Sequence, residues 1–423
     1  MKTKAYLMLG TLLTGILASS VAMADPVKLV IESWRQDDLA VWQDTILPVF
    51  NKEHPDIQVV FQPTINTDYS TALATKIKAG TAGDLIMVEP YDFRLPMYQA
   101  GDLAKLNGLS GLENFSDLVK AAWSTDDGKD VYAVPLEGVI HAFIYNQTIF
   151  DELKLTPPKT EAEFLTLLKT VKDSGKYTPL AMGSGDSFVP GLLGFQLIGP
   201  NYWHGEDGRQ GIIAGTQKFT DPQYVATWSA LKDWIPYLPD GYQGVKYADM
   251  QNLFTLGQAA VYPAGSWEIP IFNKAVGSSF KMGVFAPPVP ADGDKCYIDD
   301  MPDAGMAMNA HTANPDQAKT FLQWMTTEEF AKLWGGAMPG FFPLSTYQIP
   351  VTDPLASAYL GFRKDCASTP RISYQIISRG TPNTDAEISR VTALVVNGQM
   401  TPEDAGKTIQ GDLASWYAPQ KGK

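Results

Sequence analysis

Short apolar runs alternate with segments of helical periodicity in the first hundred residues. Residues 27–31 form an apolar run that predicts a strand. Apolar side chains then recur at helical spacing over residues 42–50, where Pro48 is expected to kink or end the helix. The same alternation next predicts a strand, a helix and a strand at residues 57–62, 69–79 and 84–88. Strands that alternate with helices predict an α/β fold with parallel strand pairing.

The alternation continues with unequal spacing through the rest of the chain. Further strands are predicted at residues 131–136, 142–146, 179–183, 259–264, 282–286 and 305–309. Thr160 and Glu163 form a capping box in front of a helix that Gly175 ends. Asn314 and Pro315 open another helix. The 423 residues suffice for two domains, yet no Pro-, Gly- or Ser-rich linker divides them, so we expect the chain to cross between domains more than once.

The first 24 residues have the features of a secretory signal peptide. Lys2 and Lys4 make a positive start, residues 5–18 are almost wholly apolar, and residues 22–24 (AMA) form a cleavage site. A membrane anchor is the alternative, but the apolar run is shorter than the roughly 20 residues of a spanning helix. No cysteine stands at the cleavage point. The mature protein is therefore expected to be soluble, without a lipid anchor, in the periplasm.

Charge and cysteine content narrow the function further. The net charge is −13, and the 33 Lys and Arg residues are scattered, so nucleic acid and anionic lipid are not expected partners. Cys296 and Cys366 are the two cysteines of the chain, and in an exported protein we expect them to form a disulfide. Two buried free thiols are the alternative.

The sequence lacks common catalytic and metal-binding motifs. It contains no G-x-S-x-G, no G-x-x-x-x-G-K-[ST] and no H-E-x-x-H. The four histidines lack metal-ligand spacing, and the acidic residues between 292 and 300 do not fit a twelve-residue calcium loop. We therefore predict no cofactor and no metal. The paired carboxylates of a glycoside hydrolase are the enzymatic alternative.

Several segments occur in the order found in one protein family. They are FNKEHPDI at residues 50–57, KAGTAGDLI at 78–86, VYAVP and IYN at 131–146, GQAAV and GSW at 257–267, and Asn314-Pro315. A final helix from Thr401 matches as well. After a signal peptide, this ordered set resembles the family 1 extracellular solute-binding proteins of ABC importers, over residues 28 to about 345.

The resemblance implies a two-lobed periplasmic-binding-protein fold of type II. Each lobe would be a mainly parallel sheet flanked by helices, and the chain would cross between lobes near Glu137, near Val284 and between Phe330 and Phe342. The expected N-terminal lobe spans residues 25–136 and 284–330, and the expected C-terminal lobe spans residues 137–283 and 331–423. The ligand would lie between the lobes and stabilise their closed arrangement.

Residues that follow the predicted strands form the candidate site, because ligands of α/β sheets lie beyond the carboxyl ends of strands. Sugars present apolar ring faces to aromatic side chains and hydroxyls to polar ones. The candidate ligand-binding residues are Trp34, Gln36, Asp37, Asp38, Glu89, Tyr91, Asp92, Glu137, Asp186, Phe188, Trp267, Asp303 and Gly340.

Each candidate also has a structural interpretation. Asp92 and Trp267 match family positions that contact sugar, and we favour that role over a helix cap for Asp92 and core packing for Trp267. Trp34 would cap the core, Glu137 would make a hydrogen bond at the hinge, and Gly340 would form a turn.

The predicted function is non-enzymatic binding of a mono- or oligosaccharide by a monomer, with delivery to a membrane permease. Glu89 and Asp385 stand where family members that bind maltodextrins have stacking tryptophans, which favours a smaller or more polar ligand. One alternative is a polyamine, a sugar phosphate or another small polar ligand. The other is a secreted glycoside hydrolase whose acid and base would be two of Asp37, Glu89, Glu137 and Asp186.

Overall fold

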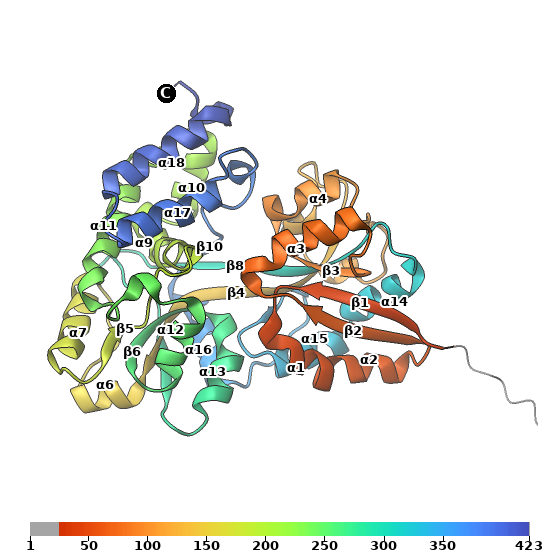
Figure 1. The fold of residues 1–423 in the computed structure, drawn as a ribbon, viewed down its shortest axis with the longest axis horizontal. Coiled ribbons are helices and arrows are strands. Elements are labelled where there is room, and N and C mark those ends of the chain that lie inside the picture. The colour runs from red at the N-terminus through yellow and green to blue at the C-terminus, as the bar shows by residue number, and fades with distance from the viewer. Residues whose placement is uncertain (1–24, 423) are drawn as a thin grey trace, which may run out of the picture.

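The chain folds into two lobes that lie side by side (Figure 1). A computed structural model describes residues 25–422, so the predicted signal peptide at residues 1–24 lies outside the described residues. Two long strands, β4 (Ala133–Asn146) and β8 (Tyr297–Met308), run from one lobe into the other. The predicted two-lobed α/β fold is confirmed.

Three parallel strands form the centre of the first lobe. β1 (Val27–Ser33) pairs in parallel with β2 (Ile57–Pro63) on one side and with β3 (Leu85–Val88) on the other. All four residues of β3 are buried. Figure 1 shows α3 (Asn66–Ala79) on one face of this sheet and α2 (Leu47–Glu53) on the other, as the alternation of strand and helix predicted.

Pro48 interrupts the first helix, as predicted. A π-helical turn covers Trp42–Ile46, and α2 begins at Leu47 with Pro48 in its first turn. Because proline has no backbone N–H, the regular helical hydrogen-bond ladder does not continue through this position.

β4 joins two strands that were predicted separately at residues 131–136 and 142–146. All of its 14 residues are buried, including the polar residues Glu137 and His141 that interrupt the apolar pattern. Its first part pairs antiparallel with β8, and its second part pairs antiparallel with β6 (Ala259–Gly265) and β7 (Met282–Phe285). β8 is likewise longer than the strand predicted at residues 305–309.

The crossing strands make the sheets mixed, whereas we had expected mainly parallel ones. β8 pairs antiparallel with β3 as well as with β4. The parallel pairs are β1 with β2 and β3, β5 (Thr178–Leu180) with β6, and β10 (Ala367–Thr369) with β8. The difference arises from the two strands that cross between the lobes, because each of these antiparallel pairs includes β4 or β8.

Helices of the second lobe begin at the predicted caps. Thr160 and Glu163 form the capping box of α7 (Glu161–Asp173), and Gly175 follows its end at a φ of 66°. Two C-terminal helices, α17 (Thr384–Val396) and α18 (Pro402–Trp416), pack on each other, and Thr401 caps the second one.

We propose that the lobes divide within β4 and β8. β7, near which a crossing was expected at Val284, pairs with residues 143–146 of β4 beside β6. β8 pairs with β10 at one end and with β3 at the other. This pairing favours a crossing inside β8.

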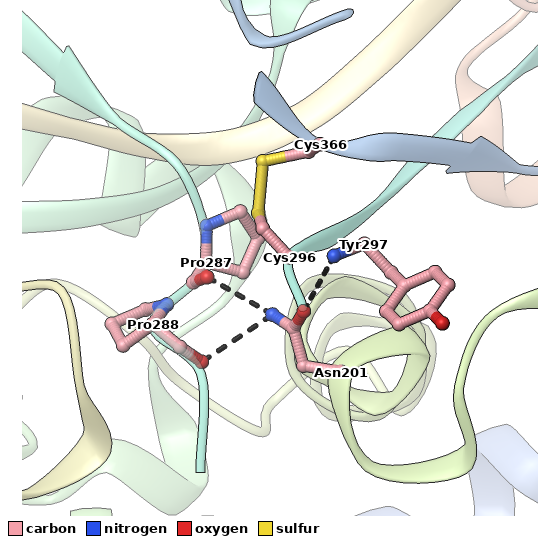
Figure 2. The surroundings of a disulfide bond; sticks show 6 residues. All are labelled: Asn201, Pro287, Pro288, Cys296, Tyr297 and Cys366. Atoms are coloured by element: carbon pink, nitrogen blue, oxygen red, sulfur yellow. Dashed lines mark hydrogen bonds between the residues drawn. A yellow bond between two sulfur atoms is a disulfide. The ribbon is translucent and has the colours of Figure 1, made fainter. Parts of the chain in front are cut away.

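A disulfide fixes the start of β8. Cys296 and Cys366 are bonded with an S–S distance of 2.04 Å, as predicted, and Figure 2 shows their surroundings. Asn201 donates to the carbonyls of Pro287 and Pro288 at 3.0 and 3.3 Å, and its oxygen accepts from the Tyr297 N–H at 2.7 Å. The disulfide thus joins the start of β8 to the residue before β10, and the Asn201 amide ties the start of β8 to α9 (Leu197–Trp203).

Among residues 25–422, no helix combines the length and the apolar character that a membrane span requires.

Candidate functional site

A cavity of about 390 Å³ lies between the two lobes, within the usual size range of small-molecule sites. Its first wall comes from the ends of β1 and β3 and from α3. Its second wall comes from α12 (Tyr247–Thr255), α17 and the turns after β6 and β10. Seven predicted site residues line it together: Trp34, Gln36, Asp37, Glu89, Phe188, Trp267 and Asp303.

The first wall begins where β1 ends. The Ser33 hydroxyl accepts a hydrogen bond from the Arg35 backbone N–H at 2.9 Å, which turns the chain and leaves Trp34 at the cavity. The Trp34 ring lies 5.6 Å from the Tyr69 ring, and the Tyr69 hydroxyl donates to the Met87 carbonyl at 2.7 Å. A half-buried tryptophan therefore presents ring surface to the cavity from a fixed support.

Charged side chains of this wall are mostly paired. Arg35 donates to both carboxylate oxygens of Asp38, at 2.8 and 2.9 Å. Burial opposes the charge of Arg35, but the pairing with Asp38 prevails and raises its pKa. Glu89 accepts from Arg94 at 2.6 and 3.1 Å. Asp38 does not line the cavity, and it acts there through Arg35.

A hydrogen-bond network holds Trp267 on the second wall. Its indole N–H donates to the Tyr247 hydroxyl at 2.8 Å, and that hydroxyl donates in turn to Glu268. Glu268 is fully buried and also accepts from Tyr262 at 2.9 Å and Gln251 at 2.8 Å. Burial raises the pKa of Glu268, and these donors act in the opposite direction. The network positions the indole ring at the cavity.

Asp303 enters the cavity from a β-bulge. Pro302 pairs with Gly138 and Ala304 pairs with Glu137, so Asp303 is the extra residue between two successive partners. Its side chain lines the cavity, and burial raises the pKa of its carboxyl. A bulge re-aims one side chain without ending the strand.

Arg371 lines the same cavity from the loop after β10, near enough to Asp303 for its charge to oppose the rise that burial causes in the pKa of that carboxyl. Its guanidinium carbon lies 5.2 Å from the centre of the Tyr374 ring. Its Nε is 3.9 Å from Asp299, which lies 2.7 Å from His141 Nδ1, and both of these partners are fully buried.

Five more predicted residues lie outside the cavity lining. Asp92 is buried and accepts from Arg379 of the second lobe at 2.7 Å, and the neighbouring Tyr91 ring lies 5.5 Å from that of Tyr374. Asp186 accepts from the Tyr247 backbone N–H at 2.9 Å, so it positions a wall residue.

Glu137 and Gly340 occupy buried positions behind the cavity. Glu137 is fully buried, and neither carboxylate oxygen has a hydrogen-bond partner of normal geometry among the described residues. Gly340 accepts a hydrogen bond from the Ser266 hydroxyl at 2.5 Å. The two backbone segments approach each other so closely here that a side chain at position 340 would collide with the Ser266 carbonyl.

Sequence reasoning missed several lining residues, notably Arg35, Tyr247, Arg371 and Tyr374. Arg35 stands between two predicted residues, so its position after β1 would have identified it. Arg371 and Tyr374 follow a strand of three residues that has no clear apolar pattern, and Tyr247 opens a helix. No local signal places these three at the cavity.

Only two of the four carboxylates considered for a hydrolase line the cavity. Asp37 and Glu89 line the cavity, whereas Glu137 is buried and Asp186 is bonded to the backbone. Among residues 25–422, no cluster of His, Cys, Asp and Glu is arranged to hold a metal ion.

Comparisons with known proteins agree with this architecture. The family model described as bacterial extracellular solute-binding protein matches residues 33–332. The chain is 26% identical over 322 residues to the multiple sugar-binding protein of Streptococcus mutans, covering 73% of this chain and 74% of that relative.

Two solved structures share the fold. One comes from work on xylan utilization by Caldanaerobius polysaccharolyticus, with a TM-score of 0.79, 20% identity and coverage of 91% of this chain and 99% of that chain. The other is the solute-binding protein RafE in complex with raffinose, with a TM-score of 0.75, 21% identity and coverage of 94% and 100%. Together with the family match over most of the chain, these findings show that the protein belongs to the bacterial extracellular solute-binding proteins.

Proposed function

We propose that the protein binds a carbohydrate between its lobes and delivers it to the permease of an ABC importer. The observation that carries this proposal is the composition of the cavity. Aromatic rings from both lobes, Trp34 and Trp267, face a space that Asp303 and Arg371 also line. A sugar ring offers apolar faces to the former and hydroxyls to the latter.

The relatives support a carbohydrate. The relative in Streptococcus mutans is a multiple sugar-binding protein, and one structure of the same fold holds raffinose. A protein of Bacillus subtilis that is 30% identical over 129 residues binds melibiose, raffinose and stachyose according to its name. The cavity also holds acidic side chains, so polyamines belong among the ligands to be tested.

We further infer that the mature protein acts outside the cytoplasmic membrane as a soluble monomer without cofactor. The family is extracellular, and the first 24 residues have the features of a signal peptide. Closure of the lobes around the ligand would present one defined surface to the permease.

A thermal-shift screen of the mature protein tests the ligand class. The panel contains melibiose, raffinose, stachyose, galactose and glucose, together with sugar phosphates and the polyamines putrescine and spermidine. A ligand that binds only the folded state raises the unfolding midpoint, and a concentration of 100 times Kd adds about 2.7 kcal/mol. We expect a neutral sugar to give the largest shift. A shift with polyamines or sugar phosphates alone would contradict the carbohydrate assignment.

Absence of catalysis is tested separately. Two of the four carboxylates considered for a hydrolase lie outside the cavity lining, so we expect no turnover of aryl glycosides. Release of nitrophenol that disappears in Glu89→Gln would contradict a pure binding function.

A further inference from the structure

We propose that Arg371 and Asp303, a cation and a carboxylate that line one cavity without forming an ion pair with each other, together bind neighbouring hydroxyls of one uncharged sugar ring and thereby exclude acidic and amino sugars. This inference rests on the proposed function, since it assigns the charge of the ligand at one end of the same cavity. Among residues 25–422, neither the Arg371 guanidinium nor the Asp303 carboxylate has a side-chain hydrogen bond of normal length.

Arg371 is held in place without using its hydrogen-bonding capacity. The Tyr374 ring supports the guanidinium at 5.2 Å, and the nearest carboxylate, Asp299, lies 3.9 Å from Nε, beyond hydrogen-bond length. That Nε is buried and has no acceptor among residues 25–422. A buried guanidinium that donates so little to the protein leaves donors for a bound molecule.

Asp303 supplies the opposite charge. The bulge in β8 directs it away from the ladder, and it lines the cavity with Arg371. None of the ion pairs among the described residues includes Asp303, in contrast to Asp38 and Glu89, which are paired with Arg35 and Arg94. Its carboxylate oxygens are therefore free to accept hydrogen bonds from a ligand.

Two other carboxylates near Arg371, those of Asp299 and Asp385, already have partners in the protein. Asp299 offsets part of the charge of Arg371 and is itself bound to His141 at 2.7 Å. Asp385, another carboxylate of the lining, accepts from the Ser373 hydroxyl at 2.5 Å. Arg371 and Asp303 thus remain available to a ligand, whereas Asp37, the other lining carboxylate without an ion pair or a side-chain hydrogen bond among residues 25–422, is solvent-exposed in the turn after β1.

A neutral polyol matches this pair, because a hydroxyl accepts from the guanidinium while its neighbour donates to the carboxylate. A uronate would be attracted by Arg371 but repelled by Asp303, and an amino sugar would meet the reverse situation. The two opposite charges of Arg371 and Asp303 therefore favour a ligand that offers hydroxyls and disfavour a ligand that carries a net charge.

The test measures binding by titration calorimetry with full-length mature protein. The probes are glucose, galactose and raffinose as neutral sugars, glucuronate and galacturonate as anions, and glucosamine and galactosamine as cations. The variants are Asp303→Asn, Arg371→Gln and Arg371→Lys. Arg363→Gln is the matched control, because Arg363 pairs with Asp300 on the exposed side of β8, at 2.7 Å, and does not line the cavity.

We expect wild type and Arg363→Gln to bind a neutral sugar at least tenfold more tightly than its charged derivatives. Asp303→Asn should lose at least tenfold in affinity for the neutral sugar and gain relative affinity for the uronate. Arg371→Gln should shift in the opposite direction, toward the amino sugar, while Arg371→Lys keeps the discrimination against the amino sugar. A merely structural role would not move these two preferences in opposite directions.

Two results overturn the assignment, and a third concerns the proposed function. Unchanged affinity of Asp303→Asn and Arg371→Gln for the neutral sugar would remove this role of the two charges but keep the carbohydrate carrier. Tighter wild-type binding of a uronate or an amino sugar would also contradict it. If the wild type binds no sugar of either panel, the proposed function itself fails, and with it the basis for this pair. Asp303→Asn is nearly isosteric and keeps the test valid should an Arg371 variant fail to fold.

Discussion

Neighbouring residues hold the aromatic side chains of the cavity in place, as Trp267 shows. Trp267 is 7% exposed, donates to Tyr247 at 2.8 Å and lines the cavity, so its ring is held in place there. Such a ring loses little conformational freedom when a ligand packs on it.

Replacement of Trp267 by alanine should weaken sugar binding about tenfold or more, because the ring contributes about 1 kcal/mol beyond its buried area. Trp267→Phe keeps an apolar ring but loses the N–H bond to Tyr247, so its loss should be smaller. Calorimetric Kd values, with thermal melting to verify the fold, give the comparison. Equal affinity of wild type and Trp267→Ala would show that the ring packs only within the protein.

Glu137 should make the stability depend on pH. Burial raises the pKa of its carboxyl well above the usual value, so the folded chain holds this proton more tightly than the unfolded chain. The resulting stability is complete below a pH of about 4.3 and is lost as pH rises through the folded pKa.

Glu137→Gln does not titrate, so its free energy of unfolding should rise relative to wild type as pH increases above about 4.3, the usual pKa of a glutamate. Urea unfolding at several pH values measures this difference. A difference between Glu137→Gln and wild type that does not change with pH would contradict the effect of burial.

At the scale of elements, close approach of backbones decides where glycine is needed. Gly340 has a φ of 94°, and a Cβ there would lie 2.1 Å from the Ser266 carbonyl oxygen. This glycine lets the end of α15 (Glu328–Ala337) meet the turn after β6 that carries Trp267.

Gly340→Ala should therefore lower the free energy of unfolding by more than about 1 kcal/mol. Gly336→Ala is the matched control four residues away, since a Cβ at Gly336 meets nothing within 4 Å and alanine favours the helix by about 0.8–1 kcal/mol. Denaturant unfolding measures the free energy of unfolding of both variants and of wild type. Similar stability of the two variants would mean that the backbone at Gly340 relaxes.

Capping residues and prolines in the sequence correctly predicted where some helices begin. The capping box at Thr160 and Pro48 in the first turn of α2 were both found as predicted. The full length of β4 was not predicted, because Glu137 and His141 break its apolar run and become strand residues through pairing with β8 and β6. Such pairing depends on segments far away in the sequence.

At the scale of the whole molecule, Arg379 connects the lobes. It donates to Asp92 at 2.7 Å and to both oxygens of Asp126 at 2.6 Å. Asp92 and Asp126 precede β4 in the first lobe, whereas Arg379 follows β10 in the second. This ion-pair cluster favours the arrangement in which the lobes are close together.

Arg379→Gln should shift the ligand-free protein toward an open arrangement by a few-fold in population, since partly exposed ion pairs contribute about 0.2–1 kcal/mol. Small-angle scattering should then give a larger radius of gyration than for wild type. Arg363→Gln, which removes an ion pair to Asp300, should leave the radius unchanged. High salt should move wild type toward the variant. An identical radius for wild type and Arg379→Gln would contradict the role of this cluster.

The cavity was predictable where it follows the first strands and not where distant segments meet. Trp34, Asp37 and Glu89 stand directly after β1 and β3, so their position at the carboxyl ends of the strands indicated them. Asp92 follows β3 as closely as Glu89 does, yet it pairs with Arg379 from the other lobe. Arg371 reaches the cavity because β10 pairs with β8 beside a disulfide, which no local pattern reveals.

The pairing of β3 with β8 also constrains the order in which the protein folds. The sheet of the first lobe needs residues 305–308, more than 200 residues after β3, and the second lobe needs the C-terminal helices. Neither lobe is complete until most of the chain has been synthesised, and such distant contacts form slowly. The chain would therefore stay incompletely folded until most of it has been synthesised, a state that suits the export predicted from residues 1–24.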